Sequence, residues 1–357
     1  MTELQTAFLG TPDIAVPALR LLAKRTQVRV VITQPDRPAG RGNKLQAPAV
    51  KVAAEQLGLP VWQPERLRDH VADARLAGID LFIVMAFGEI FPKAVLDLPR
   101  LGCVNLHASL LPRWRGASPL QAAIRAGDTQ SGVTVMRLAV GVDAGPVFNR
   151  EIVPIGPRTR LPDLHDAIAE AAARALEAYL DLDEATVPNL QDEFEATHCR
   201  KLTTDDGQLD FSHNGVELDR WVRAYTPSPG CWTLAATPDR EHPMRLRIHD
   251  LEPRPSVKSL TIGEVSVIGG ELMVGCGDGA VAVLRLQAPD RAALDAAAFL
   301  NGNPAPTQFA SPTAATAWIN FAPAWKPPCW PASAPSNCAC RWPTAPSPPS
   351  SAAIPPC

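Results

Sequence analysis

The first half of the chain alternates between short apolar runs and longer segments of helical character. Residues 6–9, 28–33, 81–85 and 131–136 are rich in apolar and β-branched side chains, as buried strands are. Helices are expected at residues 17–24, 48–57 and 161–182, because the first has Pro17 in its first turn, the second stops at Gly58 and the third is long and rich in alanine. Strands that alternate with helices predict an α/β domain, Rossmann-like, with a mostly parallel sheet and helices on both faces.

The second half of the chain has a different pattern. A short helix is expected at residues 216–225, after a polar stretch. Short strands are then expected at residues 232–234, 245–249, 264–267, 271–274 and 280–286, with glycine-containing turns at 269–270 and 277–279. Short strands joined by such turns predict a small, OB-like β-barrel.

The last stretch differs in composition from everything before it. Residues 304–357 contain no Asp or Glu, and their only charged residues are Lys326 and Arg341 among many Pro, Ala and Ser. Because prolines at this frequency do not sustain helices or strands, we expect a disordered tail, either native or the product of an altered reading frame. We therefore expect that deleting residues 306–357 leaves activity intact.

These patterns divide the 357 residues into four segments. We expect an N-terminal α/β domain at residues 1–182, a linker at 183–208, an OB-like barrel domain at 209–303 and the tail at 304–357. Two folded domains agree with the length of the chain.

Charge and cysteine content narrow the possible classes of protein. The net charge is −3, so any contact with RNA must depend on local basic patches. No secretory signal and no apolar run of membrane-spanning length is present, which predicts a cytoplasmic protein. The eight cysteines include no Cys-x-x-Cys pair, so we expect free thiols and no bound metal.

Candidate catalytic chemistry lies near the middle of the chain. Asn105 and His107 follow an apolar run, and Asp143 stands alone between glycines. If residues 102–107 form a strand, Asn105 and His107 face the same crevice at the carboxyl end of the sheet, where ligands bind in such folds. An amide that donates to an oxyanion, an imidazole that moves a proton and a carboxylate that orients the imidazole suit acyl transfer to an amine. Taken alone, the Asn-x-His pair also fits a solvated loop, and Asp143 fits a turn.

Several longer stretches carry a resemblance to a known family. They are residues 8–13 (FLGTPD), 33–42 (TQPDRPAGRG), 105–116 (NLHASLLPRWRG), 141–145 (GVDAG) and 299–302 (FLNG). In order and spacing they resemble the folate-dependent formyltransferases, and residues 34–42 resemble the branch of that family that formylates methionyl-tRNA. The resemblance covers residues 5–303 and implies transfer of a formyl group from 10-formyltetrahydrofolate, as co-substrate, to the α-amino group of initiator methionyl-tRNA for translation initiation.

The resemblance also implies roles for individual residues. Asn105, His107 and Asp143 match the catalytic set of the family. The expected folate-binding residues are Phe87, Gly88, Ser109, Leu110, Leu111, Pro112 and Val140. The expected tRNA-binding residues are Arg37, Arg41, Lys44 and Lys201, the first three in a Gly- and Pro-containing loop. For Phe87 and Leu110 ordinary core packing is an equally good interpretation.

The chain departs from the family pattern at two places, and two other functions remain possible alternatives. The chain has Thr226-Pro227-Ser228-Pro229-Gly230 where the family often carries a Trp, and Ala144 where Thr is commoner. A formyltransferase acting on another amine, such as a nucleotide-sugar, shares the catalytic set but lacks the stretch at residues 34–42. A catalytically idle RNA-binding protein would not need Asn105, His107 and Asp143. We expect a monomer whose partners are methionyl-tRNA and a folate.

Overall fold

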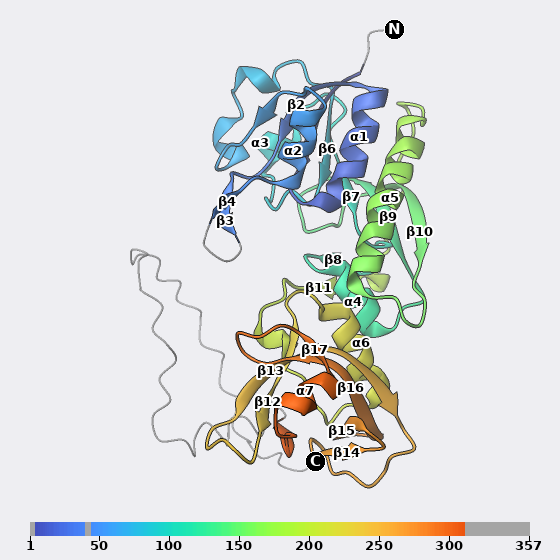
Figure 1. The fold of residues 1–357 in the computed structure, drawn as a ribbon. Coiled ribbons are helices and arrows are strands. Elements are labelled where there is room, and N and C mark those ends of the chain that lie inside the picture. Colours follow the sequence, from blue (N-terminus) through green and yellow to red (C-terminus); the bar gives the residue numbers. More distant parts are fainter. Residues whose placement is uncertain (1–3, 40–43, 311–357) are drawn as a thin grey trace, which may run out of the picture.

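The computed structural model describes residues 4–39 and 44–310, which form an elongated molecule of two lobes (Figure 1). The N-terminal lobe is built on a seven-stranded sheet in the order β10-β9-β7-β6-β1-β2-β5. Five neighbouring strands, β7 to β5, run parallel, whereas β9 is antiparallel to both β7 and β10. The strands are β1 (Gln5–Gly10), β2 (Gln27–Ile32), β5 (Val61–Trp62), β6 (Leu81–Met85), β7 (Cys103–His107), β9 (Gln130–Arg137) and β10 (Val147–Pro154).

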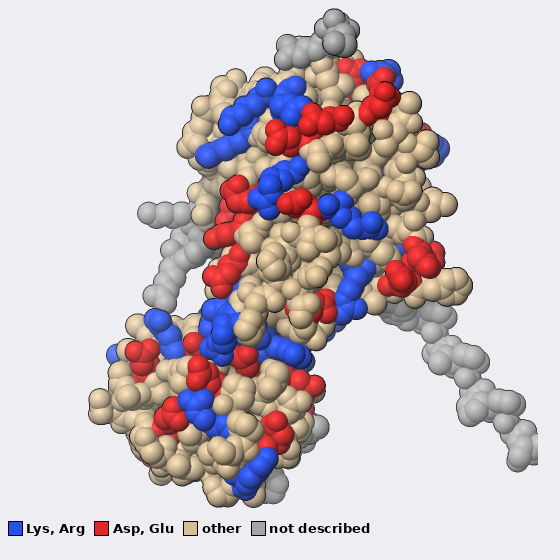
Figure 2. Space-filling view, turned by 90° about the vertical axis from the view of Figure 1, so that its right-hand side faces the viewer, with Lys and Arg blue, Asp and Glu red and all other residues tan. Residues whose placement is uncertain are grey.

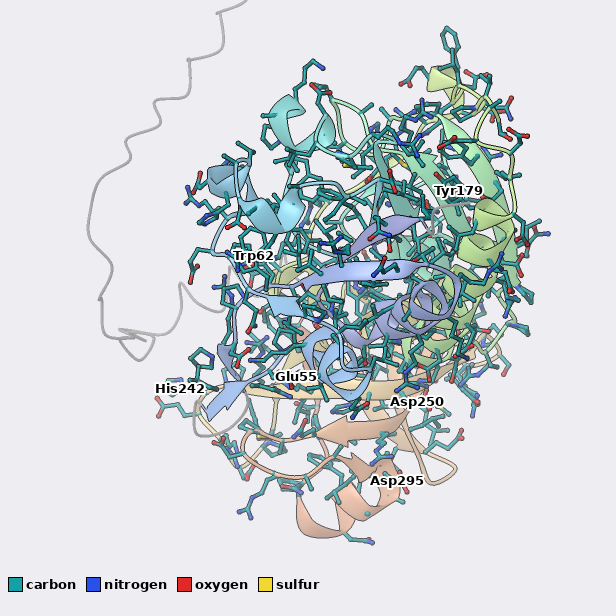
Figure 3. The ribbon with its side chains drawn as sticks, turned by 90° about the horizontal axis from the view of Figure 1, so that it is seen from above. Glu55, Trp62, Tyr179, His242, Asp250 and Asp295 are labelled. Carbon is teal, nitrogen blue, oxygen red and sulfur yellow. The ribbon has the colours of Figure 1, made fainter. Side chains whose placement is uncertain are left out.

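Helices cover both faces of this sheet, as the sequence predicts. The first face packs against α1 (Val16–Arg25), α2 (Ala49–Gln56), α4 (Pro119–Ala126) and α5 (Leu161–Leu180). The second face packs against α3 (Lys93–Leu96) and the segments that precede it. Because side chains alternate along a strand, Phe8 of β1 enters the first core and its neighbours Ala7 and Leu9 enter the second. In Figure 3, Trp62 of β5 and Tyr179, which packs on Phe148 of β10, mark opposite sides of the lobe.

A two-stranded hairpin projects from the N-terminal lobe toward the level of the barrel (Figure 1). It consists of β3 (Arg37–Ala39) and β4 (Lys44–Gln46), so the expected Gly- and Pro-containing loop is wrong for these residues, which form two paired strands. Pro38 is tolerated because a two-stranded ribbon leaves one edge of each strand free of ladder bonds. Hydrogen bonds from Gln63 and Lys51 hold Asp36 at the hairpin base and lower the pKa of its carboxyl.

The C-terminal lobe is an antiparallel barrel with the strand order β14-β15-β16-β13-β12-β18, and β17 pairs with β16. Helix α6 (Gly215–Tyr225) joins it to the first lobe, since α6 packs against both α4 and β13. The expected helix at 216–225 and the five expected barrel strands are all present. The barrel elements are β12 (Cys231–Ala236), β13 (Met244–Arg254), β14 (Val265–Ile268), β15 (Glu271–Cys276), β16 (Gly279–Gln287), β17 (Leu294–Asp295), α7 (Ala296–Gly302) and β18 (Gln308–Ala310).

Strand β18 closes the barrel, and the expectation that the disordered tail begins at residue 304 is therefore wrong. Its residues pair with β12 on one side, and on the other the Phe309 N–H donates to the Gly263 carbonyl at 2.7 Å. Phe309 is fully buried against Phe211, with ring centroids 5.7 Å apart. Gly263 has a φ of +75°, and a Cβ there would lie 2.4 Å from the Phe309 carbonyl oxygen. The remainder of the expected tail, residues 311–357, lies outside the described residues.

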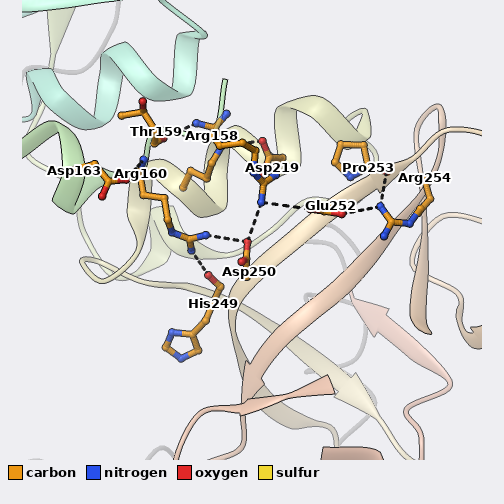
Figure 4. Close-up of polar contacts among 11 residues, drawn as sticks. Arg158, Thr159, Arg160, Asp163, Asp219, His249, Asp250, Glu252, Pro253 and Arg254 are labelled. Carbon is orange, nitrogen blue, oxygen red and sulfur yellow. Dashed lines mark hydrogen bonds and ion pairs between the residues drawn. The ribbon is translucent and has the colours of Figure 1, made fainter. Parts of the chain in front are cut away.

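An ion-pair network connects the two lobes (Figure 4). Arg158 and Arg160 precede α5 and reach Asp219 of α6 and Asp250 of β13, at 3.1 Å and 2.9 Å respectively. Asp219 also accepts from the buried Arg223 at 2.8 Å, and Arg223 donates to the Thr159 carbonyl at 2.7 Å. Figure 2 shows Lys and Arg side chains gathered where the lobes meet. The network ties the orientation of the barrel to the start of α5.

Candidate active site

The candidate site forms at the carboxyl end of β7, as the sequence predicts. In the register of the sheet Asn105 lies between Val84 of β6 and Met136 of β9, and His107 lies opposite Thr134 of β9. Asn105 and His107 are two residues apart on the strand, so their side chains point to one face of the sheet. Strand β7 runs parallel to β6, so both residues lie at the carboxyl edge of the parallel strands, where ligands bind in open α/β folds.

The His107 ring is held between two oxygen atoms. Its Nδ1 lies 3.5 Å from Asp143 Oδ2, and its Nε2 lies 3.0 Å from the Trp114 carbonyl oxygen. The side chain of His107 is only 7% exposed and that of Asp143 16%. The structure therefore brings His107 and Asp143 together, as the sequence predicts for an imidazole oriented by a carboxylate.

Asp143 is positioned by its backbone and by a second loop. Its φ of +50° lies in the left-handed region, which is unusual for a residue with a Cβ. Its Oδ2 accepts the Gly116 N–H at 2.9 Å, and Gly116 has a φ of +113°. A Cβ at Gly116 would lie 2.1 Å from the Cys199 carbonyl oxygen, so only glycine fits there without rearrangement. The loop around Asp143 and the loop that ends at Gly116 thus meet at the carboxylate.

The loop between β7 and Gly116 is fixed by its own polar groups. The fully buried Ser109 donates to the Arg113 carbonyl at 2.6 Å, and its carbonyl accepts from the Thr134 hydroxyl at 2.6 Å. Thr134 in turn accepts the Leu111 N–H at 3.0 Å. These bonds, together with the one from Nε2 of His107, hold the Trp114 carbonyl beside the ring.

The expected folate-binding residues occupy different environments. Phe87 is 3% exposed and packs on Phe91, which agrees with the core interpretation given for it, and Leu111 is buried as well, at 1% exposed. Gly88 and Val140 are exposed, the latter at 80%. Leu110 and Pro112 are half-buried, and the hydroxyl of Ser109 is already occupied within its own loop.

The expected tRNA-binding residues are only partly described. Arg37 is exposed at the start of β3, and Lys201 is exposed in the segment between the lobes. Arg41 and the side chain of Lys44 lie outside the described residues. The described strands of the hairpin, β3 with Arg37 and β4, extend away from the body of the lobe (Figure 1).

The sequence prediction missed a third component of the site, which comes from the segment treated as a linker. Gln191 donates to the carbonyls of Asp143 and Gly145, at 2.8 Å and 2.7 Å. Arg115, 3% exposed, donates to the Gln191 Oε1 and forms a bidentate pair with Glu193. A polar, acidic stretch after a helix has the composition of a solvated linker, so no signal in the chain distinguished Gln191 and Glu193.

The charges around the site follow from this pairing. The hydrogen bonds of Arg115 lower the pKa of the Glu193 carboxyl, and Glu193 raises the pKa of the Arg115 guanidinium. Burial raises the pKa of the nearby Cys199 thiol, and it raises the pKa of Cys103, at the start of β7, to about 12.

In the described part of the chain no group of His, Cys, Asp and Glu side chains is arranged to hold a metal ion. None of the described helices is both long and apolar enough to cross a membrane.

Comparison with family models defines the class of protein. The formyl transferase model matches residues 5–180, and the model of the formyl transferase C-terminal domain matches residues 201–304. Both lobes are therefore those of a formyl transferase. The methionyl-tRNA formyltransferases of Thiobacillus denitrificans and Gluconobacter oxydans are 44% and 43% identical to this chain, and each match covers 84% of it and 96% or 97% of the relative. The chain belongs to the methionyl-tRNA formyltransferase family.

Solved structures share the fold at low sequence identity. The N-formyltransferase from Helicobacter canadensis, solved with folinic acid and dTDP-3-aminofucose, has a TM-score of 0.57 at 16% identity, over 78% of this chain and 98% of that chain. WlaRD, a sugar 3N-formyl transferase, has a TM-score of 0.58 at 15% identity, over 82% and 100% of the two chains. These likenesses concern the fold alone.

Proposed function

We propose that this chain transfers the formyl group of 10-formyltetrahydrofolate to the α-amino group of initiator methionyl-tRNA. The observation that carries the proposal is the position of His107, held at the end of β7 between Asp143 and the Trp114 carbonyl, two residues after Asn105. The extent of the relatives supports the choice of substrate, because the match runs through both lobes of proteins named methionyl-tRNA formyltransferase.

The reaction is a substitution at the formyl carbon. The amine nitrogen of the methionyl group forms a bond to that carbon, the formyl oxygen becomes an oxyanion, and the bond to N10 of the folate then breaks. The attacking amine loses a proton and N10 gains one, so the net products are formylmethionyl-tRNA and tetrahydrofolate. We assign donation to the oxyanion to the Asn105 amide, which removes no proton and carries no charge of its own.

His107 and Asp143 move and stabilise charge in this scheme. Each ring nitrogen of His107 has an oxygen atom beside it, Asp143 Oδ2 at 3.5 Å from Nδ1 and the Trp114 carbonyl at 3.0 Å from Nε2. The ring is therefore held in one orientation while it takes part in proton transfer. We assign to this ring the transfer of the amine proton, directly or through a water. Asp143 keeps the ring oriented and balances its charge.

One assay tests this function directly. Purified protein, labelled 10-formyltetrahydrofolate and charged tRNA are combined, with initiator and elongator methionyl-tRNA in separate reactions. We expect label on initiator methionyl-tRNA. Transfer of label to an amino-sugar nucleotide and not to tRNA would favour the second candidate, a sugar formyltransferase. Formylation of neither acceptor, with RNA binding retained, would favour an idle RNA-binding protein.

We expect Arg41→Ala to weaken the use of methionyl-tRNA far more than the binding of folate. Arg41 lies in the chain between β3 and β4, the two strands of the hairpin, and an RNA offers many phosphates for such a cation to meet, whereas the pterin ring of the folate offers none. Loss of one phosphate contact should also reduce the salt dependence of tRNA affinity by roughly one contact. The measurement is the apparent affinity for methionyl-tRNA at several salt concentrations.

Arg20→Ala is the matched control for this variant, since Arg20 is an exposed arginine on α1. Arg20→Ala should change neither affinity. A fall in folate binding with unchanged tRNA binding in Arg41→Ala would assign the hairpin to the folate site instead. Arg37, Lys44 and Lys201 are the further tRNA contacts that we propose, and each can be measured in the same way.

We also propose that the protein acts in the cytoplasm as a monomer. Its proposed substrates, charged tRNA and a reduced folate, are soluble cytoplasmic molecules, and the mechanism above uses residues of a single chain. Light scattering of the purified protein at micromolar concentration should give the mass of one chain. A stable dimer would require the tRNA-binding faces to be assigned again.

A further inference from the structure

The segment between the lobes lies against the candidate site along its whole course. We call residues 189–199 the interdomain strap. At its start, Asn189 and Val147 exchange two backbone hydrogen bonds of 2.8 Å and 2.7 Å. At its end, β11 (His198–Cys199) pairs in parallel with β8 (Arg115–Gly116). The strap therefore contacts both the loop of Asp143 and the loop of Trp114.

Within the strap, Gln191 holds the backbone that carries Asp143. Its single amide nitrogen donates to two carbonyl oxygens, those of Asp143 and Gly145. Gly145 is itself tightly packed, because a Cβ there would lie 1.8 Å from the Arg137 carbonyl oxygen. Two bonds from one amide thus fix the ends of a short turn whose first residue has the left-handed φ of +50°.

A chain of charged groups then fixes Gln191 itself. The Gln191 Oε1 accepts from Arg115 Nε at 3.0 Å, and the two terminal nitrogens of Arg115 donate to Glu193 at 2.9 Å and 2.8 Å. Arg115 is 3% exposed, so its planar guanidinium is held in one orientation by its packing as well as by these bonds. With Arg115 in place, the amide of Gln191 has one orientation that satisfies both of its ends.

We infer that Gln191, Arg115 and Glu193 are positioning residues for the proposed transfer reaction, and that they set the orientation of the Asp143 carboxylate toward His107. The inference rests on the proposed function. None of the three is placed here in contact with a substrate. They act through the Asp143 backbone, which they hold in a conformation that a residue with a Cβ rarely adopts unaided.

The first test separates kcat from KM. Gln191→Leu keeps the volume and removes the donor, and it should lower kcat for methionyl-tRNA formylation on the order of 10-fold to 100-fold, as small displacements of a catalytic group do. KM for methionyl-tRNA and for 10-formyltetrahydrofolate should stay within about twofold, because the loops that would meet the substrates remain. A wild-type kcat, or a fall in thermal stability that accounts for the whole loss, would overturn the inference.

Two glutamates of the strap provide a matched pair. Glu193→Gln removes the charge opposite Arg115, whereas Glu195→Gln removes an exposed charge that forms no ion pair with any residue described. We expect a lower kcat in Glu193→Gln alone. Glu193→Asp should restore part of the activity, because it returns the carboxylate with a shorter reach. Equal effects of the two Gln variants would show a general effect of charge and contradict the inference.

A readout that needs no turnover separates this inference from the proposed function. Spectra of ¹⁵N-labelled histidine rings report on His107 directly, with its signal assigned by the loss in His107→Ala. In Gln191→Leu the His107 signal should move in the same direction as in Asp143→Asn, and in Glu195→Gln it should stay. An unmoved signal overturns the inference even if the enzyme is active. A shifted signal in a protein that formylates no tRNA would leave the strap correct and the proposed substrate wrong.

Discussion

Replacing His107 with alanine should lower kcat for formyl transfer by about 10²–10⁴-fold, the range typical of losing a group that moves a proton in the transition state. The ring contacts both Asp143 and the Trp114 carbonyl, so its removal also leaves the Asp143 carboxylate without its imidazole partner. Asn105→Ala should cost about 10²–10³-fold, as loss of one oxyanion donor does. Single-turnover formylation of methionyl-tRNA measures both effects.

His242→Ala is the control for this experiment. His242 is exposed on the barrel lobe and lies at the outer margin of the molecule in Figure 3. It should retain the wild-type rate, and circular dichroism should show that all three variants are folded. Turnover at the wild-type rate in His107→Ala would remove the mechanism proposed here, whatever the stability of the variant.

Ending the chain after residue 307 should destabilise the barrel strongly, whereas ending it after residue 312 should not. The expectation from the sequence that residues 306–357 can be deleted without loss is therefore replaced, because β18 lies within them. The shorter chain loses β18 and with it the fully buried Phe309. Truncating a buried Phe to Ala typically costs about 3–5 kcal/mol, and the truncation also leaves β12 and Gly263 without their backbone partners. Urea denaturation followed by barrel tryptophan fluorescence measures the difference.

Phe309→Ala and Phe309→Leu in the full-length chain separate the side chain from the strand. The alanine variant should lose about 3–5 kcal/mol of unfolding free energy, and the leucine variant should lose less because it fills part of the volume. If the chain ending at residue 307 unfolds at the same urea concentration as the chain ending at residue 312, then β18 contributes no stability and the barrel is complete without it.

The parts of the fold that the sequence predicted are those with long, regular patterns. Strand β6 coincides with its expected range, and α5 begins where the alanine-rich stretch begins. The direction of β9 did not follow from its sequence, because a strand buried on both faces has the same composition in a parallel and an antiparallel neighbourhood. Strand β18 was missed because three residues in a proline-rich stretch are too few to show an alternating pattern of apolar and polar side chains. They become a strand only by pairing with β12 in the barrel.

The candidate site was predictable to the extent that it is local. Asn105 and His107 share a face because of their spacing on a strand, and spacing is visible in a sequence. The approach of Asp143 was expected from the residue types and from the family resemblance, because spacing says nothing of it: β8, α4 and β9 separate Asp143 from His107 in the chain. The strap contacts could not be predicted from the sequence. Gln191 and Glu193 belong to the site only through their hydrogen bonds with Arg115, which lies more than seventy positions earlier.

The strap has a consequence for how such an enzyme can be divided or recombined. The two family models leave residues 181–200 between them, so a chimera designed on those boundaries would join one parent's Asp143 loop to another parent's Gln191. The two sides of the Gln191 hydrogen bonds, and the two partners of the Arg115–Glu193 ion pair, would then come from different parent proteins. A crossover placed after Cys199 transfers the strap with the lobe that it serves, and the exchanged barrel lobe then has to match the ion pairs of Arg158 and Arg160 and the packing of α6 on α4.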